Sequence, residues 1–151
     1  MIREEIVYGV KLGYSLGRME FIWDSTMKEA RDEFENAKKE ILDVLKIEKC
    51  EPEQDSYQSF CSSILNHFER NNLNIYAMIL VGIGAFRGML VTKIDEKNPN
   101  REEMLKLAKN TFLIIPKFAV PNAMELFKKI ADNEAYAPYE IVEIVLNHLN
   151  I

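Results

Sequence analysis

The chain has 151 residues, 48% of them hydrophobic and 28% charged, with a formal net charge of −5 at pH 7. These values are typical of one globular domain, which we expect to span residues 1–151. The acidic balance, with no basic tract, argues against a nucleic-acid partner. Cys50 and Cys61 make no disulfide framework, and Arg3 is followed by glutamates rather than by a signal peptide, so a cytoplasmic location is expected.

The apolar residues recur at helical spacing along the whole chain, which predicts an all-α fold of six or seven helices. We expect the first helix from Ile2 to about Trp23 and the second to about Ile47. One continuous helix over this stretch would be about 69 Å long. A compact domain of this size has a radius of gyration near 15 Å. The sequence therefore predicts a break near Asp24.

The most apolar segment of the chain is predicted to be its central helix. A third helix is expected to begin at Ser56 or Asp55 and to end in the asparagine-rich segment 71–74. The fourth, about Ile75–Lys93, is apolar all round, as in a helix buried on every side. It reaches only the lower edge of a membrane-spanning length and carries Arg87, so no membrane span is expected.

Prolines and asparagines mark the last three helices. The fifth is predicted to open at 98–100, with Pro99 in its first turn, and to end at Pro116. Asn122 and Glu125 have the spacing of an N-terminal cap for a short sixth helix. Pro138 is expected to begin the last one.

All six glycines fall within the first and fourth predicted helices. A glycine inside a helix costs roughly 0.5–1 kcal/mol relative to alanine. Three in each helix therefore indicate that another backbone or a ligand approaches closely. At 100° per residue, those of the first helix lie on its apolar face and those of the fourth on two faces. The glycines are Gly9, Gly13, Gly17, Gly82, Gly84 and Gly88.

One set of polar residues accompanies these glycines. The glycine stripe of the first helix continues to Glu20 and Asp24, and Arg87 is the lone charge within the apolar stretch of the fourth. A buried arginine must reach solvent or find a carboxylate, so a structural ion pair of Arg87 with Glu20 or Asp24 is one interpretation. The other is a pocket for a small polar ligand. Its candidate residues are Arg87, Glu20, Asp24, Gly13, Gly17, Gly84 and Gly88.

Motifs for metal or cofactor chemistry are sparse. Neither His67 nor His148 has a glutamate three residues before it, as di-iron helices require, and there is no Cys-x-x-Cys pair. No metal and no cofactor are expected. One acidic face of the second helix carries carboxylates at spacings that can hold Mg²⁺ and phosphates. Because lysines interleave with them, a solvated charged face explains them better. They are Glu29, Asp32, Glu33, Glu40 and Asp43.

The sequence favours a non-enzymatic helical interaction or regulatory module. Its smooth helical faces and excess of apolar helical surface predict association with itself, as a homodimer, or with another protein. The segments 116–121 and 136–139 are apolar enough to contact a partner. The alternatives are a small-ligand-binding protein or enzyme that uses the Arg87 pocket and, more weakly, a metal-dependent nucleotide phosphohydrolase on the acidic face.

Overall fold

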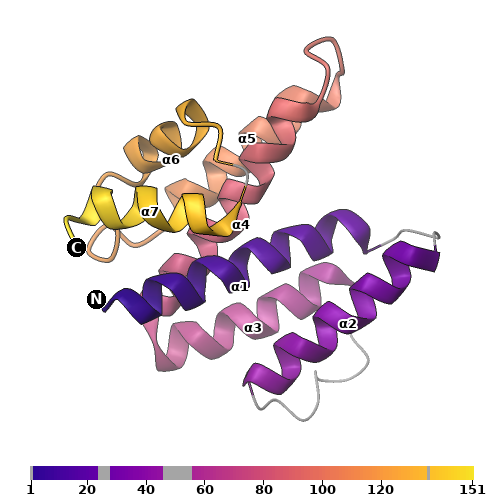
Figure 1. Cartoon of the computed structure of the whole chain (residues 1–151), viewed down its shortest axis with the longest axis horizontal. Helices are drawn as coiled ribbons and strands as arrows, with labels where there is room; N and C mark the ends of the chain where they lie inside the picture. Colours follow the sequence, from indigo (N-terminus) through magenta and orange to yellow (C-terminus); the bar gives the residue numbers. More distant parts are fainter. Residues whose placement is uncertain (1, 24–27, 46–55, 136) are drawn as a thin grey trace.

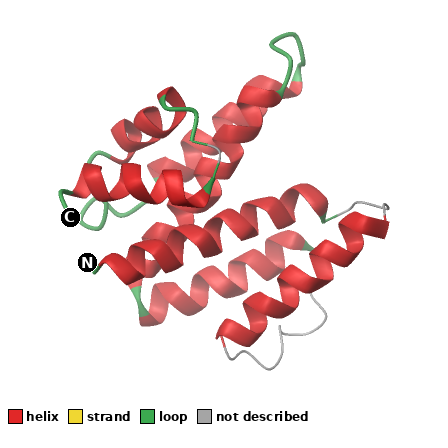
Figure 2. Cartoon of the chain, in the orientation of Figure 1, coloured by secondary structure: helices red, strands yellow, loops and turns green. Residues whose placement is uncertain are grey.

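Seven α-helices and no strand make up the parts of the chain that a computed structural model describes, residues 2–23, 28–45, 56–135 and 137–151 (Figures 1 and 2). The all-α prediction is confirmed. The predicted break at Asp24 lies outside the described residues, but the first two helices are separate elements. The helices are α1 Arg3–Ile22, α2 Lys28–Leu45, α3 Tyr57–Asn71, α4 Leu73–Lys93, α5 Asn100–Leu113, α6 Ala123–Asp132 and α7 Pro138–Leu149.

Two polar side chains cap the starts of α3 and α4 where the sequence predicts helix boundaries. The Ser59 amide donates to Ser56 Oγ at 3.2 Å, and the Ile75 amide donates to Asn72 Oδ1 at 3.1 Å. Each bond satisfies an amide that no helical carbonyl reaches. These caps fix where α3 and α4 begin.

The cap predicted for α6 does not form. Asn122 precedes this helix with a left-handed φ of 55°, and its side chain caps no amide. An asparagine tolerates this conformation, which turns the chain sharply into α6. Glu125 instead lies 3.6 Å from Lys129 Nζ, one turn along the same helix.

The central position predicted for the fourth helix is confirmed in α4, which packs against α1, α3, α5, α6 and α7. With α1 it divides the core into two apolar clusters, one toward α3 and the other toward α5, α6 and α7. By length and mean hydropathy α4 resembles a membrane span, yet 67% of its most apolar stretch is buried inside the domain. A helix that is apolar all round suits this setting.

Glycines bring α1 and α4 into backbone contact. A Cβ added to Gly13 would overlap the carbonyl group of Ile79 and lie 2.8 Å from its carbon. On the opposite side of the same contact, a Cβ on Gly82 would lie 2.7 Å from the Tyr14 nitrogen. No alanine fits at either position without moving a helix. The close approach predicted from the glycine spacing is therefore present, and its partner is backbone.

The other side of α4 receives aromatic rings. A Cβ on Gly84 would lie 2.7 Å from Cδ2 of Phe112 on α5, and one on Gly88 would lie 3.2 Å from Cε2 of Phe127 on α6. The two rings also contact each other, with centroids 4.9 Å apart. The small residues on two faces of α4 thus serve two different kinds of packing.

Candidate functional site

Arg87 lies near the end of α4, where this helix contacts α1 and α5, and it forms an ion pair within the domain. Its side chain is only 14% exposed, and its Nε and Nη2 lie 3.0 Å and 2.9 Å from Glu20 Oε2. Nη1 donates to Thr111 Oγ1 at 2.6 Å, and this hydroxyl donates to the Leu107 carbonyl at 2.9 Å. The Arg87–Glu20 pair predicted as one interpretation is present. Asp24 lies outside the described residues.

The close contact of α1 with α4 brings the two charges together. A Cβ on Gly17 would lie 2.9 Å from Phe86 Cβ, so the backbone of α1 rests on this ring. Glu20 follows Gly17 by three residues, nearly one turn, and Arg87 follows Phe86 directly. The carboxylate therefore reaches the guanidinium across the same narrow contact.

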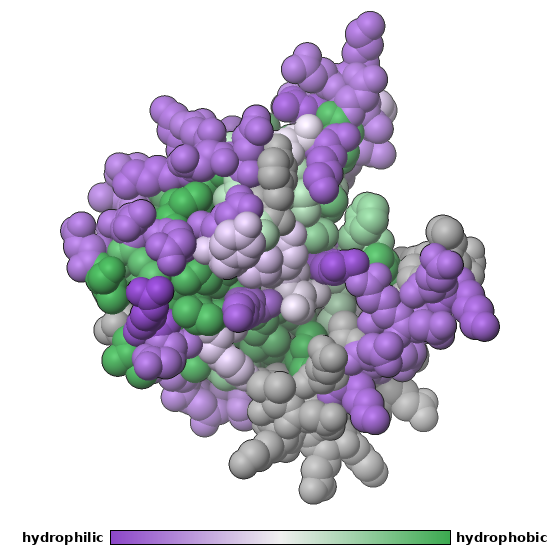
Figure 3. All heavy atoms as spheres, viewed as in Figure 1, coloured by the Kyte–Doolittle hydropathy of each residue, from purple (hydrophilic) through white to green (hydrophobic). Residues whose placement is uncertain are grey.

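A hollow of about 260 Å³, here called the notch, opens over this ion pair between α1, α4 and α5. In Figure 1 the α4–α5 hairpin projects beyond the rest of the domain, and in Figure 3 apolar atoms reach the surface beside it. Phe21 is 67% exposed and Leu107 39% exposed at the notch. Its lining residues are Gly17, Glu20, Phe21, Arg87, Leu90, Met104 and Leu107.

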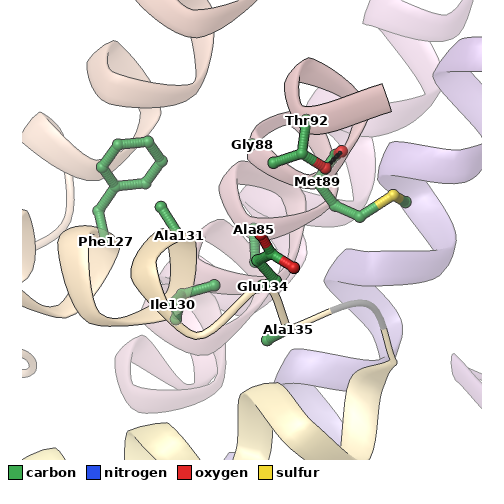
Figure 4. A pocket seen from close by; sticks show the side chains of 9 residues that line it. All are labelled: Ala85, Gly88, Met89, Thr92, Phe127, Ile130, Ala131, Glu134 and Ala135. Carbon is green, nitrogen blue, oxygen red and sulfur yellow. Dashed lines mark hydrogen bonds between the residues drawn. The ribbon is translucent and has the colours of Figure 1, made fainter. Parts of the chain in front are cut away.

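Of the glycines predicted to line a ligand site, Gly17 alone lines the notch. Gly13 is covered by α4 and Gly84 by Phe112. Gly88 borders a separate apolar gap between α4 and α6, shown in Figure 4, whose volume of about 10 Å³ holds at most one water molecule. The structure thus brings Arg87, Glu20 and Gly17 together and places the other glycines in packing contacts.

Beneath the ion pair, Tyr57 and Cys61 of α3 form a buried polar group that the sequence analysis did not single out. The Cys61 thiol is a polar neighbour of the Tyr57 hydroxyl, and the hydroxyl makes no hydrogen bond of ordinary length and angle among the described residues. Burial raises the pKa of Tyr57 well above its ordinary 10.0, and burial also raises the pKa of the Cys61 thiol. Glu20 and Arg87 are near enough to influence both groups. The thiol is therefore protonated at neutral pH and is a poor nucleophile.

The residues considered for metal binding are dispersed. Glu29, Asp32 and Glu33 are exposed on α2, and Glu33 pairs with Arg18 of α1. The side chains of Glu40 and Asp43 lie outside the described residues. Within the described ranges, no group of three or more histidine, cysteine or acidic side chains is placed to hold a metal ion.

The two histidines have structural partners. The ring of His67 meets that of Phe68 edge to face, with centroids 5.2 Å apart. His148 Nε2 lies 2.7 Å from the Pro121 carbonyl oxygen, and its Nδ1 lies 3.2 Å from Lys129 Nζ. The contact with Pro121 ties the end of α7 to the loop between α5 and α6.

No family model, no curated protein and no solved structure matches the chain. The assignment of function therefore rests on the geometry of its own side chains.

Proposed function

We propose that this protein is a non-enzymatic helical interaction module that forms a homodimer through the notch. The observation that carries the proposal is an apolar hollow between three helices, with exposed Phe21 and Leu107 at a surface whose charged groups are already paired. Apolar side chains that gather at a concave surface are characteristic of protein contacts. Phe21 is the most exposed large apolar side chain at the notch.

The notch suits protein side chains better than a small polar ligand. Its volume of about 260 Å³ lies below the range of roughly 300–1,000 Å³ that is usual for small-molecule pockets. Arg87 already donates to Glu20 and Thr111, so an anionic ligand would have to displace a carboxylate to reach it. That exchange would cost most of the energy that it supplies.

A second copy of the chain is the partner that the shape favours. The α4–α5 hairpin projects beside the notch, so a twofold axis there would let each hairpin cover the other copy's hollow (Figure 1). Twofold dimers bring one surface against itself. This is favourable only where like charges do not meet, and in the notch the Arg87–Glu20 pair is neutral as a unit.

The dimer is tested by sedimentation velocity from micromolar to several hundred micromolar protein, with Phe21→Ser as the test variant. Burying a phenylalanine contributes about 1.5–3 kcal/mol. A twofold dimer loses this contribution twice, so the dimerisation constant should fall by about 10²- to 10⁴-fold. Because Phe21 is 67% exposed, the fold itself should lose little stability.

The matched control is Phe118→Ser, which removes the same side chain at a position that is 76% exposed in the loop between α5 and α6. This variant should dimerise like the wild type. A wild-type protein that stays monomeric at every concentration would refute the homodimer. Equal loss of dimer in both variants would refute the notch as its interface.

A further inference from the structure

The connection between α5 and α6 exposes large apolar side chains that the core does not use. Its buried residues, Ile115, Ala119 and Val120, anchor it in the larger core cluster. Leu113, Ile114 and Phe118 point outward and are 65%, 63% and 76% exposed. The outward set therefore belongs to a well-anchored segment, and packing within the domain does not account for it. We call residues 109–129 the corner; they comprise the last turn of α5, the loop 114–122 and the first two turns of α6.

Lysines surround this apolar tip. Lys109 lies one turn before Leu113 on α5, Lys128 lies one turn after Met124 on α6, and Lys117 stands in the loop between them. Leu113, Lys117 and Met124 line one groove of about 340 Å³, so the two helices and the loop face the same hollow. The segment 109–129 holds four lysines and one glutamate, a formal charge of +3 in a chain of −5. The single glutamate, Glu125, is paired with Lys129.

The charge at the corner identifies an anionic occupant. A twofold contact of two corners would set lysines against lysines, so this surface is unsuited to a second copy. All four basic residues of the corner are lysine, which protein interfaces disfavour, whereas arginine, which they favour, does not occur in 109–129. Exposed apolar residues with a lysine rim are the pattern of proteins that bind the surface of an anionic bilayer.

We propose that the corner docks the protein on an anionic lipid bilayer, with Leu113, Ile114 and Phe118 entering the interface. Four residues of helix separate Leu113 from Lys109, about 6 Å along the axis. Interfacial segments bury their apolar residues about 5–10 Å deep, so the lysines would lie at the level of the lipid phosphates. The negative leaflet of a cell membrane is the one that faces the cytoplasm.

The test is flotation of the full chain with phosphatidylcholine vesicles that contain or lack phosphatidylserine. We expect binding only to vesicles with phosphatidylserine, and we expect it to weaken as salt rises. Phe118→Ser should lower the partition coefficient about ten- to a hundredfold, because one large apolar side chain leaves the interface. Lys117→Gln should lower it about fivefold.

The control is Phe21→Ser, which alters the notch and leaves the corner intact, so it should bind vesicles like the wild type. Absence of binding to phosphatidylserine vesicles, or equal binding to both compositions, would overturn the proposal. So would a Phe118→Ser variant that binds like the wild type, or one that fails to dimerise, since the latter would assign the corner to a second copy. Because each variant is expected to affect only one assay, failure of this inference is distinguishable from failure of the notch dimer.

Discussion

Replacing Gly13 by alanine offers the most direct test of the contact between α1 and α4. In an ordinary helix this change is stabilising by about 1 kcal/mol, because alanine is the better helix former. Here the new methyl group would overlap the carbonyl group of Ile79, and neither helix can yield locally. Overpacking costs about 1–3 kcal/mol, and rigid backbone places this site at the upper end. The expected net loss is about 2 kcal/mol.

The assay is urea denaturation and thermal melting followed by far-ultraviolet circular dichroism. For a domain of this length, the loss at Gly13 corresponds to a melting temperature lower by about 4–8 °C. Gly88→Ala is the matched control, because its Cβ would meet only the edge of the Phe127 ring at 3.2 Å. That ring can shift by a few tenths of an ångström. The gain in helix propensity should therefore offset the energetic cost of the tight contact, and the free energy of unfolding should stay close to that of the wild type. A Gly13→Ala protein at least as stable as the wild type would refute the close-approach argument.

Two further predictions concern the polar residues near the notch. Glu20→Gln should lower the free energy of unfolding by about 2 kcal/mol, because Arg87 loses its partner in a setting between buried and exposed. Glu33→Gln removes the exposed ion pair of Glu33 with Arg18. In the same urea titration this variant should lose less than about 1 kcal/mol of unfolding free energy. At alkaline pH, unfolded chains release protons from Cys61 and Tyr57 near their ordinary pKa values of 9.0 and 10.0, whereas the raised pKa values keep both groups protonated in the fold. Stability should therefore fall as pH rises above about 9, by up to about 1.4 kcal/mol per unit and group. Tyr57→Phe should flatten this decline, and an unchanged slope would contradict the assigned burial.

The helices could be predicted because their signals are local. Asn72 and Pro138 stand at helix starts, and the glycines repeat with the period of one helix face. The Arg87–Glu20 pair could also be predicted from the sequence. A lone charge on an apolar helix needs a carboxylate, and the glycine stripe of the first helix continues to Glu20. The cap expected at Asn122 was wrong because the side chain pattern does not reveal a left-handed backbone.

The rest of the site depends on packing between distant segments. Thr111 is an ordinary position on α5 until the fold sets its hydroxyl against Arg87, 24 residues away in the chain. The lysines of the corner are similarly dispersed, so they make no basic tract in the sequence. The loop 114–122 connects α5 to α6 and places residues of both helices at one groove, so the lysines gather around one apolar tip. The spacing of residues in the sequence predicts which face of a helix a residue lies on. It does not predict which residues of distant segments come into contact.

The two surfaces of α5 follow from one physical difference. At its amino-terminal half, Met104 and Leu107 face the notch, where the nearby charges are already paired. At its carboxyl-terminal end, Leu113 and Ile114 stand among lysines, of which Lys129 alone has an acidic partner within the corner. An apolar surface with internally balanced charge can meet its own copy without repulsion, whereas one with a single sign of charge needs an opposite field. The same helix can therefore serve self-association at one end and an anionic surface at the other, because the charges beside each apolar group differ while the apolar groups themselves are alike.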